Sequence, residues 1–152
     1  MVGPLDVRIE ISMSNRSASR QNVEKMEEIA HLLVRIPALR GACELDLLVF
    51  FHRHPRVLLT NEQLAALVGY DRKQVATTID AFVEAGLMER NKNPTHAARL
   101  YVLLLDSQPG GGLTRLLKLA STRQGRLDIL RALNAQRQRT QAQENRKLHA
   151  IA

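Results

Sequence analysis

Apolar and polar residues alternate through residues 5–13 of the 152-residue chain, with apolar side chains at Leu5, Val7, Ile9, Ile11 and Met13. A spacing of two predicts a short, half-buried β-strand. A single strand is not stable without a partner, so an unstructured N-terminal arm that happens to alternate is an equal alternative. Met13 could also be the true first residue, which the sequence does not decide.

From residue 20 onwards the apolar residues recur every three or four positions, which predicts amphipathic helices. The first helix ends at Pro37, because proline cannot continue a helix. Its apolar positions are Val23, Met26, Ile29, Ala30, Leu33 and Ile36. A second helix, apolar on nearly every side, is expected from about Ala42 to Arg53 and should form the centre of the core.

Residues 57–59 predict a short strand, and two short helices with clear end signals follow it. Thr60 begins the first helix with a capping-box spacing, and Gly69 ends it. Asp71 begins the second helix with a similar pattern, and Gly86 ends it. Two capped helices joined by a short turn are typical of a helix-turn-helix.

Two strand-like runs, residues 87–90 and 99–105, enclose a segment rich in turn-forming residues. A hairpin directly after a helix-turn-helix predicts a winged helix. The glycine-rich residues 108–112 then predict a break, followed by two leucine-rich helices, the second beginning after Gly125. Residues 134–147 contain only two apolar residues, both alanine, and form either a solvated helical extension or a disordered tail.

A resemblance to a known family rests on three stretches, Leu59-Thr60-Asn61-Glu62-Gln63-Leu64-Ala65, Val75-Ala76-Thr77-Thr78-Ile79-Asp80 and Glu84-Ala85-Gly86-Leu87-Met88-Glu89-Arg90. Through residues 45–105, about 40% of the chain, the sequence resembles bacterial winged helix-turn-helix transcriptional regulators, most closely the MarR family. In that family the wing usually carries an Asp-x-Arg motif. Arg99 stands at the place of its arginine, with no aspartate before it.

The resemblance implies a sequence-specific, double-stranded DNA-binding transcriptional regulator that acts as a homodimer. A recognition helix at about 71–85 would enter the major groove, and a wing at about 90–99 would lie on the backbone or in the minor groove. The flanking helices would form a two-fold dimer. A small-molecule effector, if there is one, would lie between these helices and the winged domain, although no group of residues identifies it.

The expected fold is mainly α with a small β-hairpin wing, an α+β winged helix-turn-helix with flanking N- and C-terminal dimerisation helices. The expected parts are an N-terminal arm (1–19), an N-terminal dimerisation helix (20–41), the winged-helix DNA-binding domain (42–106), C-terminal dimerisation helices (107–134) and a polar basic tail (135–152).

The spacing of apolar residues in the second helix of the helix-turn-helix predicts one buried and one exposed side, with Val75, Ile79 and Phe82 on the buried side. The N-terminal residues of recognition helices contact base edges, so the candidate base contacts are Arg72, Lys73, Gln74, Ala76 and Thr77. Arginine or lysine suits guanine, glutamine suits adenine, and methyl groups suit thymine. The candidate phosphate contacts of the wing are Arg90, Lys92, His96 and Arg99. The alternative is that these residues are ordinary solvated surface.

The net charge of +7 favours a polyanionic partner, but its distribution is uneven. Residues 1–55 are neutral and residues 56–105 carry +1, so +6 lies in residues 106–152. Asp80 and Glu84 are expected to point away from DNA, because carboxylates repel phosphates. Two other functions stay open: a winged helix that binds a basic protein through these two carboxylates, and nonspecific nucleic-acid binding through the basic tail.

The remaining chemistry is sparse. The single cysteine, Cys43, excludes an intramolecular disulfide, and a buried inert thiol is favoured over a peroxide sensor. His52 and His54 are two positions apart and point to different faces of a helix, which does not suit a metal site. No nucleotide-binding or catalytic motif is present, so neither an enzyme activity nor a cofactor is expected.

Two classes of protein are disfavoured by composition and patterning. Aromatic residues make up 3% of the chain, which argues against a base-stacking surface for single strands. No apolar run approaches the length of a membrane span, and the N-terminus lacks the features of a signal peptide. A cytoplasmic protein that does not enter a membrane is therefore expected.

Overall fold

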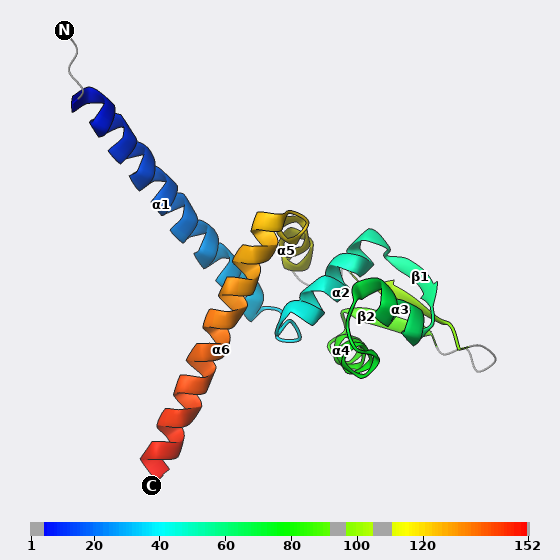
Figure 1. The fold of residues 1–152 in the computed structure, drawn as a ribbon. Coiled ribbons are helices and arrows are strands. Elements are labelled where there is room, and N and C mark those ends of the chain that lie inside the picture. Colours follow the sequence, from blue (N-terminus) through cyan, green and yellow to red (C-terminus); the bar gives the residue numbers. More distant parts are fainter. Residues whose placement is uncertain (1–4, 92–96, 105–110, 152) are drawn as a thin grey trace.

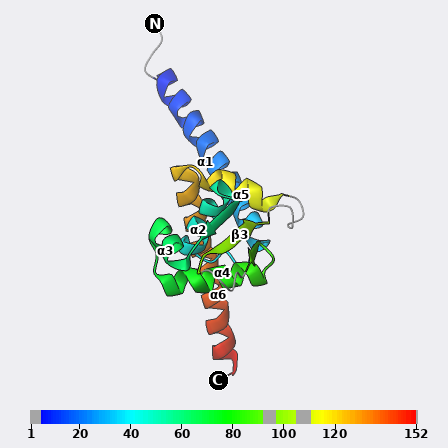
Figure 2. The same ribbon diagram turned by 90° about the vertical axis from the view of Figure 1, so that its right-hand side faces the viewer.

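A computed structural model describes the backbone of residues 5–91, 97–104 and 111–151, and the side chains of residues 16–91, 97–104 and 111–150. The elements in chain order are α1 (Leu5–Val34), α2 (Ala42–Arg53), β1 (Arg56–Leu59), α3 (Asn61–Val68), α4 (Arg72–Glu84), β2 (Met88–Asn91), β3 (Arg99–Leu103), α5 (Gly112–Ala120) and α6 (Arg123–Ile151). α3, α4 and the sheet form a compact body at one end of the molecule, away from the crossing of α1 and α6 (Figure 1). Figure 2 shows both long helices projecting beyond this body in opposite directions.

The strand expected at residues 5–13 is wrong, because α1 is a continuous helix of 30 residues beginning at Leu5. A strand needs a hydrogen-bonding partner, whereas a helix satisfies its backbone groups internally and can extend from a segment that is already held. Packing of the buried Ile29 and Leu33 holds the C-terminal part of α1. An extended conformation would therefore leave the backbone of residues 5–13 without hydrogen-bonding partners, whereas the helix supplies them.

The helix-turn-helix forms as its end signals predict. Thr60 Oγ1 accepts a hydrogen bond from the backbone N–H of Gln63 at 3.1 Å, and Gln63 Oε1 accepts one from the N–H of Thr60 at 3.0 Å. Gly69 has a left-handed φ of 76° at the end of α3. Asp71 caps α4 by accepting a hydrogen bond from the N–H of Lys73 at 3.2 Å. The predicted caps of α3 are confirmed, and so is Asp71 as the N-cap of α4, although it bonds to Lys73 with no reciprocal bond from Gln74. The C-cap of α4 is Ala85, one residue before the predicted Gly86.

The wing is part of a three-stranded antiparallel sheet with the strand order β1-β3-β2. The predicted hairpin is β2 with β3, in a register that pairs Met88 with Leu103. β1 lies on the other side of β3, and Leu59 pairs with Arg99. This arrangement of two capped helices followed by a hairpin confirms the expected winged-helix fold class.

The hydrophobic core is centred on α2, as its composition predicts. Leu45, Leu47, Leu48 and Phe51 of this helix are completely buried. They meet buried side chains of α3, α4, β3 and α5, namely Leu64, Val75, Ile79, Phe82, Tyr101, Leu113, Leu116 and Leu117. α2 therefore connects the winged body to the C-terminal helices through one continuous core.

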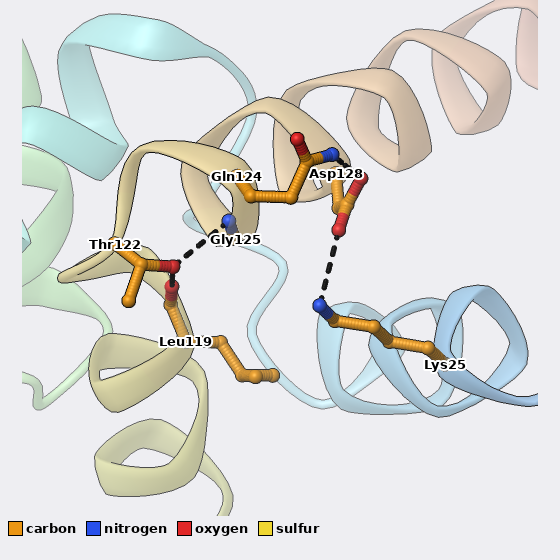
Figure 3. Close-up of polar contacts among 6 residues, drawn as sticks. All are labelled: Lys25, Leu119, Thr122, Gln124, Gly125 and Asp128. Carbon is orange, nitrogen blue, oxygen red and sulfur yellow. Dashed lines mark hydrogen bonds and ion pairs between the residues drawn. The ribbon is translucent and has the colours of Figure 1, made fainter. Parts of the chain in front are cut away.

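The α5–α6 corner differs from the prediction, because α6 begins at Arg123 and Gly125 lies in its first turn. Thr122 Oγ1 accepts a hydrogen bond from the N–H of Gly125 at 3.0 Å, as a helix cap does (Figure 3). Of the two alternatives for the tail, the structure has the helix: α6 continues to Ile151, and its side chains are exposed from Asn134 to Ala150. Gly125 therefore does not break the helix. It allows the first turn of α6 to pass close to the carbonyl oxygen of Leu119.

Candidate nucleic-acid interface

α4 presents a buried side and an exposed side, as predicted. Val75, Ile79 and Phe82 are at most 1% exposed and fix the helix against the core. Four of the five candidate base contacts are exposed at its N-terminal half, Arg72, Lys73, Gln74 and Thr77, whereas Ala76 is half-buried. These four side chains are therefore accessible to a ligand within the first six residues of α4.

Thr77 shows how a candidate side chain is oriented. Its hydroxyl donates a hydrogen bond to the carbonyl oxygen of Lys73 at 2.9 Å. This bond leaves the hydroxyl without a free donor, so the methyl group and the oxygen lone pairs are what Thr77 offers a ligand. A methyl contact with thymine is compatible with that arrangement.

Two candidate DNA-binding arginines form ion pairs in the free protein. Arg72 Nη2 lies 2.8 Å from Glu62 Oε1, and both side chains are about two-thirds exposed (65% and 69%). Arg90 Nη1 lies 2.7 Å from Asp80 Oδ1, and the Arg90 side chain is only 16% exposed. Exposed pairs contribute little stability, so Arg72 can exchange Glu62 for an acceptor on a ligand. Arg90 is held back against α4 by the carboxylate of Asp80.

The wing is described only in part. Arg99 is half-buried at the first position of β3, next to the loop. The other two wing candidates, Lys92 and His96, lie outside the described residues. The strands place Arg99 on the same hairpin as Arg90, beside α4.

A polar bridge behind the helix-turn-helix had not been anticipated from the sequence. Tyr70, in the turn between α3 and α4, donates a hydrogen bond to Asp46 Oδ2 of α2 at 2.5 Å. Arg126 of α6 donates two more to the same carboxylate, from Nε to Oδ1 and from Nη2 to Oδ2, both at 2.9 Å. The partners are separated by 24 and 80 positions in the chain, and no local motif joins them.

The bridge shifts the pKa values of its members. Burial alone would raise the pKa of Asp46, but the hydrogen bonds from Arg126 and Tyr70 outweigh it and hold that pKa below the ordinary value. Burial and the hydrogen bond to Asp46 raise the pKa of Tyr70 to about 12. At neutral pH the bridge therefore consists of a carboxylate, a neutral phenol and a guanidinium.

A second surface feature is a groove of about 770 Å³ between α1 and α6. Its lining is largely small or apolar and comprises Ala18, Ser19, Asn22, Val23, Met26, Glu27, Ala30, Val34, Ala132, Ala135, Gln136 and Arg139. Val23 and Val34, two of its apolar residues, are 55% and 71% exposed. Beside the groove, Lys25 Nζ of α1 lies 3.3 Å from Asp128 Oδ2 of α6 (Figure 3).

The other candidate groups carry little reactivity. Cys43 is buried, as expected, with Sγ 3.8 Å from Thr78 Oγ1. Burial raises the pKa of its thiol, which disfavours the reactive thiolate. Among the residues with described positions, no three His, Cys, Asp or Glu side chains gather into a possible metal site. No helix within the described ranges is long and apolar enough to cross a membrane.

No protein-family model matches the sequence, and no curated protein matches it. Among solved structures, the chain is similar to RV1404 from Mycobacterium tuberculosis, with 22% identity, 97% of this chain and 82% of that chain covered, and a TM-score of 0.39. It is similar to the YusO protein from Bacillus subtilis, with 14% identity, 99% and 93% covered, and a TM-score of 0.42. It is also similar to a mutant MarR from E. coli complexed with operator DNA, with 18% identity, 91% and 95% covered, and a TM-score of 0.44.

Proposed function

We propose that this protein is a sequence-specific, double-stranded DNA-binding transcriptional regulator of the MarR-like type that acts as a homodimer. The observation that carries the proposal is the exposed N-terminal half of α4. It presents Arg72, Lys73, Gln74 and Thr77 to solvent, while the opposite side of the same helix is locked into the core. A helix held in this way, next to a hairpin, can enter a major groove without rearranging.

The exposed side chains supply different base preferences. Arg72 and Lys73 donate hydrogen bonds and match the acceptors of guanine, whereas Gln74 can both donate to and accept from adenine. Thr77 adds a methyl group for thymine. Arg99 and the other basic residues of the wing would bind phosphates or the minor groove and so set the register of α4.

A homodimer is the second part of the proposal. The exposed valines of the α1–α6 groove, Val23 and Val34, both lie on α1, one of the two long helices that extend away from the winged body. Two copies related by a two-fold axis would bury the same patch of each chain. In this division α1, α5 and α6 form the dimer, and residues 42–106 form the DNA-binding part.

Electrostatics also support a dimer. Residues 56–105 carry a net charge of only +1, so one winged body would bind phosphate-rich DNA weakly. Two bodies on one duplex raise the avidity without requiring new contacts. The basic residues of α6 that face solvent, among them Arg146 and Lys147, would add contacts that do not depend on sequence.

The test is selection of binding sites from a random duplex library, followed by affinity measurements across a series of salt concentrations. Lys73→Ala combined with Gln74→Ala should abolish the preference for the selected site and lower its affinity by about a hundredfold, because two base contacts are lost. Arg53→Ala is the matched control, since it removes an exposed basic residue at the end of α2, outside α4, the wing and the proposed dimer helices. It should leave the preference unchanged.

The other outcomes separate the alternatives. If the double substitution in α4 preserves the sequence preference, the proposed recognition helix is wrong. If only Arg146→Gln with Lys147→Gln lowers the affinity, and no site is preferred, the protein is a nonspecific binder that uses α6. If the protein binds no duplex even at low salt, a protein-interaction module becomes the better explanation.

A further inference from the structure

The carboxylate of Asp46 joins α2 to two other segments, the turn before α4 and the start of α6. Asp46 lies on α2, Tyr70 in the turn before α4, and Arg126 near the start of α6. The carboxylate accepts three hydrogen bonds, at 2.5, 2.9 and 2.9 Å. Its side chain is 25% exposed and that of Arg126 is 39% exposed. A charge-assisted, bidentate contact of this kind fixes the relative orientation of the groups that it joins, whereas apolar packing is not directional.

On one side, the bridge holds the start of α4. Tyr70 stands between Gly69, the left-handed end of α3, and Asp71, the cap of α4. Its backbone N–H also contacts the carbonyl oxygen of Ala65 at 3.3 Å. Because both its main chain and its hydroxyl are engaged, Tyr70 is held in place directly before the cap of α4.

On the other side, the bridge holds the first turns of α6. Arg126 and Asp128 are two positions apart and bind different neighbours, Asp46 of α2 and Lys25 of α1. The hydrogen bond from Gly125 to Thr122 fixes the same turn to the α5–α6 corner (Figure 3). This part of α6 thus connects the α1–α6 crossing with the start of α4.

We propose that Tyr70, Asp46 and Arg126 are positioning residues that set the angle between α4 and the α1–α6 crossing, and hence the distance between half-sites that the protein accepts. The inference rests on the proposed homodimeric DNA-binding function and adds to it the structural basis for the distance between half-sites. Two recognition helices bind one duplex together only when their separation matches the helical repeat. A stiff connection narrows the range of separations, and a loosened one broadens it.

The experiment uses the full chain and three kinds of duplex: the site selected by the wild-type protein, the same site with one to three base pairs inserted between its halves, and a single half-site. One inserted base pair turns a half-site by about 35°. The wild-type affinity should then fall about tenfold or more, because simultaneous binding of both halves is lost.

Tyr70→Phe removes the hydrogen bond at one end of the bridge. Arg126→Gln removes the bidentate contact at the other end. Each variant should bind the single half-site within about twofold of the wild-type protein, whereas its affinity for the selected site should fall about tenfold as the second half-site contributes less. The penalty for one inserted base pair should shrink to about threefold. Tyr70→Phe with Arg126→Gln should resemble either single variant, because the bridge is already cut.

Two further variants serve as controls. Arg126→Lys keeps the charge without the two-pronged contact and should fall between the wild-type protein and Arg126→Gln. Arg123→Gln removes the same charge from the same turn outside the bridge and should behave like the wild-type protein. Should Arg126→Gln not fold, Tyr70→Phe and Arg126→Lys decide the question.

The inference is overturned if the wild-type protein prefers one spacing and both single variants keep that preference unchanged. It is also overturned if they lose as much affinity for the single half-site as for the full site, since the bridge would then only stabilise α4. A wild-type protein with no duplex binding or no spacing preference removes the proposed function itself. The two failures are therefore distinguishable.

Discussion

At Gly125 the first turn of α6 passes so close to the end of α5 that a Cβ atom would lie 1.8 Å from the carbonyl oxygen of Leu119. Alanine usually stabilises a helix relative to glycine by about 0.5–1 kcal/mol. Gly125→Ala should instead destabilise the protein by about 2 kcal/mol or more, because backbone must move to remove the clash. Urea unfolding monitored by circular dichroism measures this difference.

Gly112→Ala is the matched comparison for that residue. It also lies in the first turn of a helix, but among the residues that the structure describes a Cβ there would meet only Leu32 Cδ2, at 3.4 Å. The substitution should be close to neutral. Equal effects of the two substitutions would show that the close approach at the α5–α6 corner does not constrain the fold.

Between elements, the pair Asp80–Arg90 ties α4 to β2 and places a carboxylate beside the candidate interface. Asp80→Asn removes one negative charge and releases Arg90. The affinity for duplex DNA should rise severalfold, and the dependence of log affinity on log salt should steepen by about one unit, as for one added phosphate contact.

Glu84→Gln controls for charge alone, because it removes a carboxylate from the same helix outside this ion pair. Its effect on affinity should be smaller, with no change in the salt slope. If the two substitutions have equal effects, Arg90 does not reach the DNA, and the gain of Asp80→Asn is only long-range electrostatics.

For the whole molecule, the α1–α6 groove is the proposed dimer surface. Val23 is 55% exposed and lines this groove. Val23→Asp would place a charge in a surface that dimerisation desolvates, so the variant should sediment as a monomer and lose the avidity of two half-sites. The wild-type protein should sediment as a dimer at the same micromolar concentration.

Leu58→Asp is the control for that substitution. Leu58 is exposed to a similar extent, 62%, but lies on β1 in the winged body. It should leave the dimer intact. A Val23→Asp variant that remains dimeric would place the interface elsewhere.

Local signals were sufficient to predict the helix-turn-helix and its wing. Thr60, Gly69 and Asp71 act through neighbours within a few positions, so their effects can be read in the chain. The buried side of α4 follows from its apolar spacing for the same reason. The N-terminal strand was predicted wrongly because alternation specifies a strand only where a sheet edge is available to pair with it.

Longer-range features could not be predicted. The sequence predicts β1 as a strand, but its pairing with β3 joins residues that are 40 to 46 positions apart. The contacts of Arg90 with Asp80 and of Arg126 with Asp46 join residues on different elements. Gly125 resembled a helix break, because its close approach to Leu119 exists only after α5 and α6 have folded together.

The sequence by itself determined the order of the elements from α2 to α5, the N-caps of α3 and α4 and the composition of the exposed face of α4, since these depend on hydrogen bonds and apolar spacing within a few residues. Only the tertiary structure decided which charged residues are paired, how far α1 extends as a helix, and how Asp46 connects the start of α4 to α6. These features depend on distances between segments remote in the chain, which packing of the α2 core establishes.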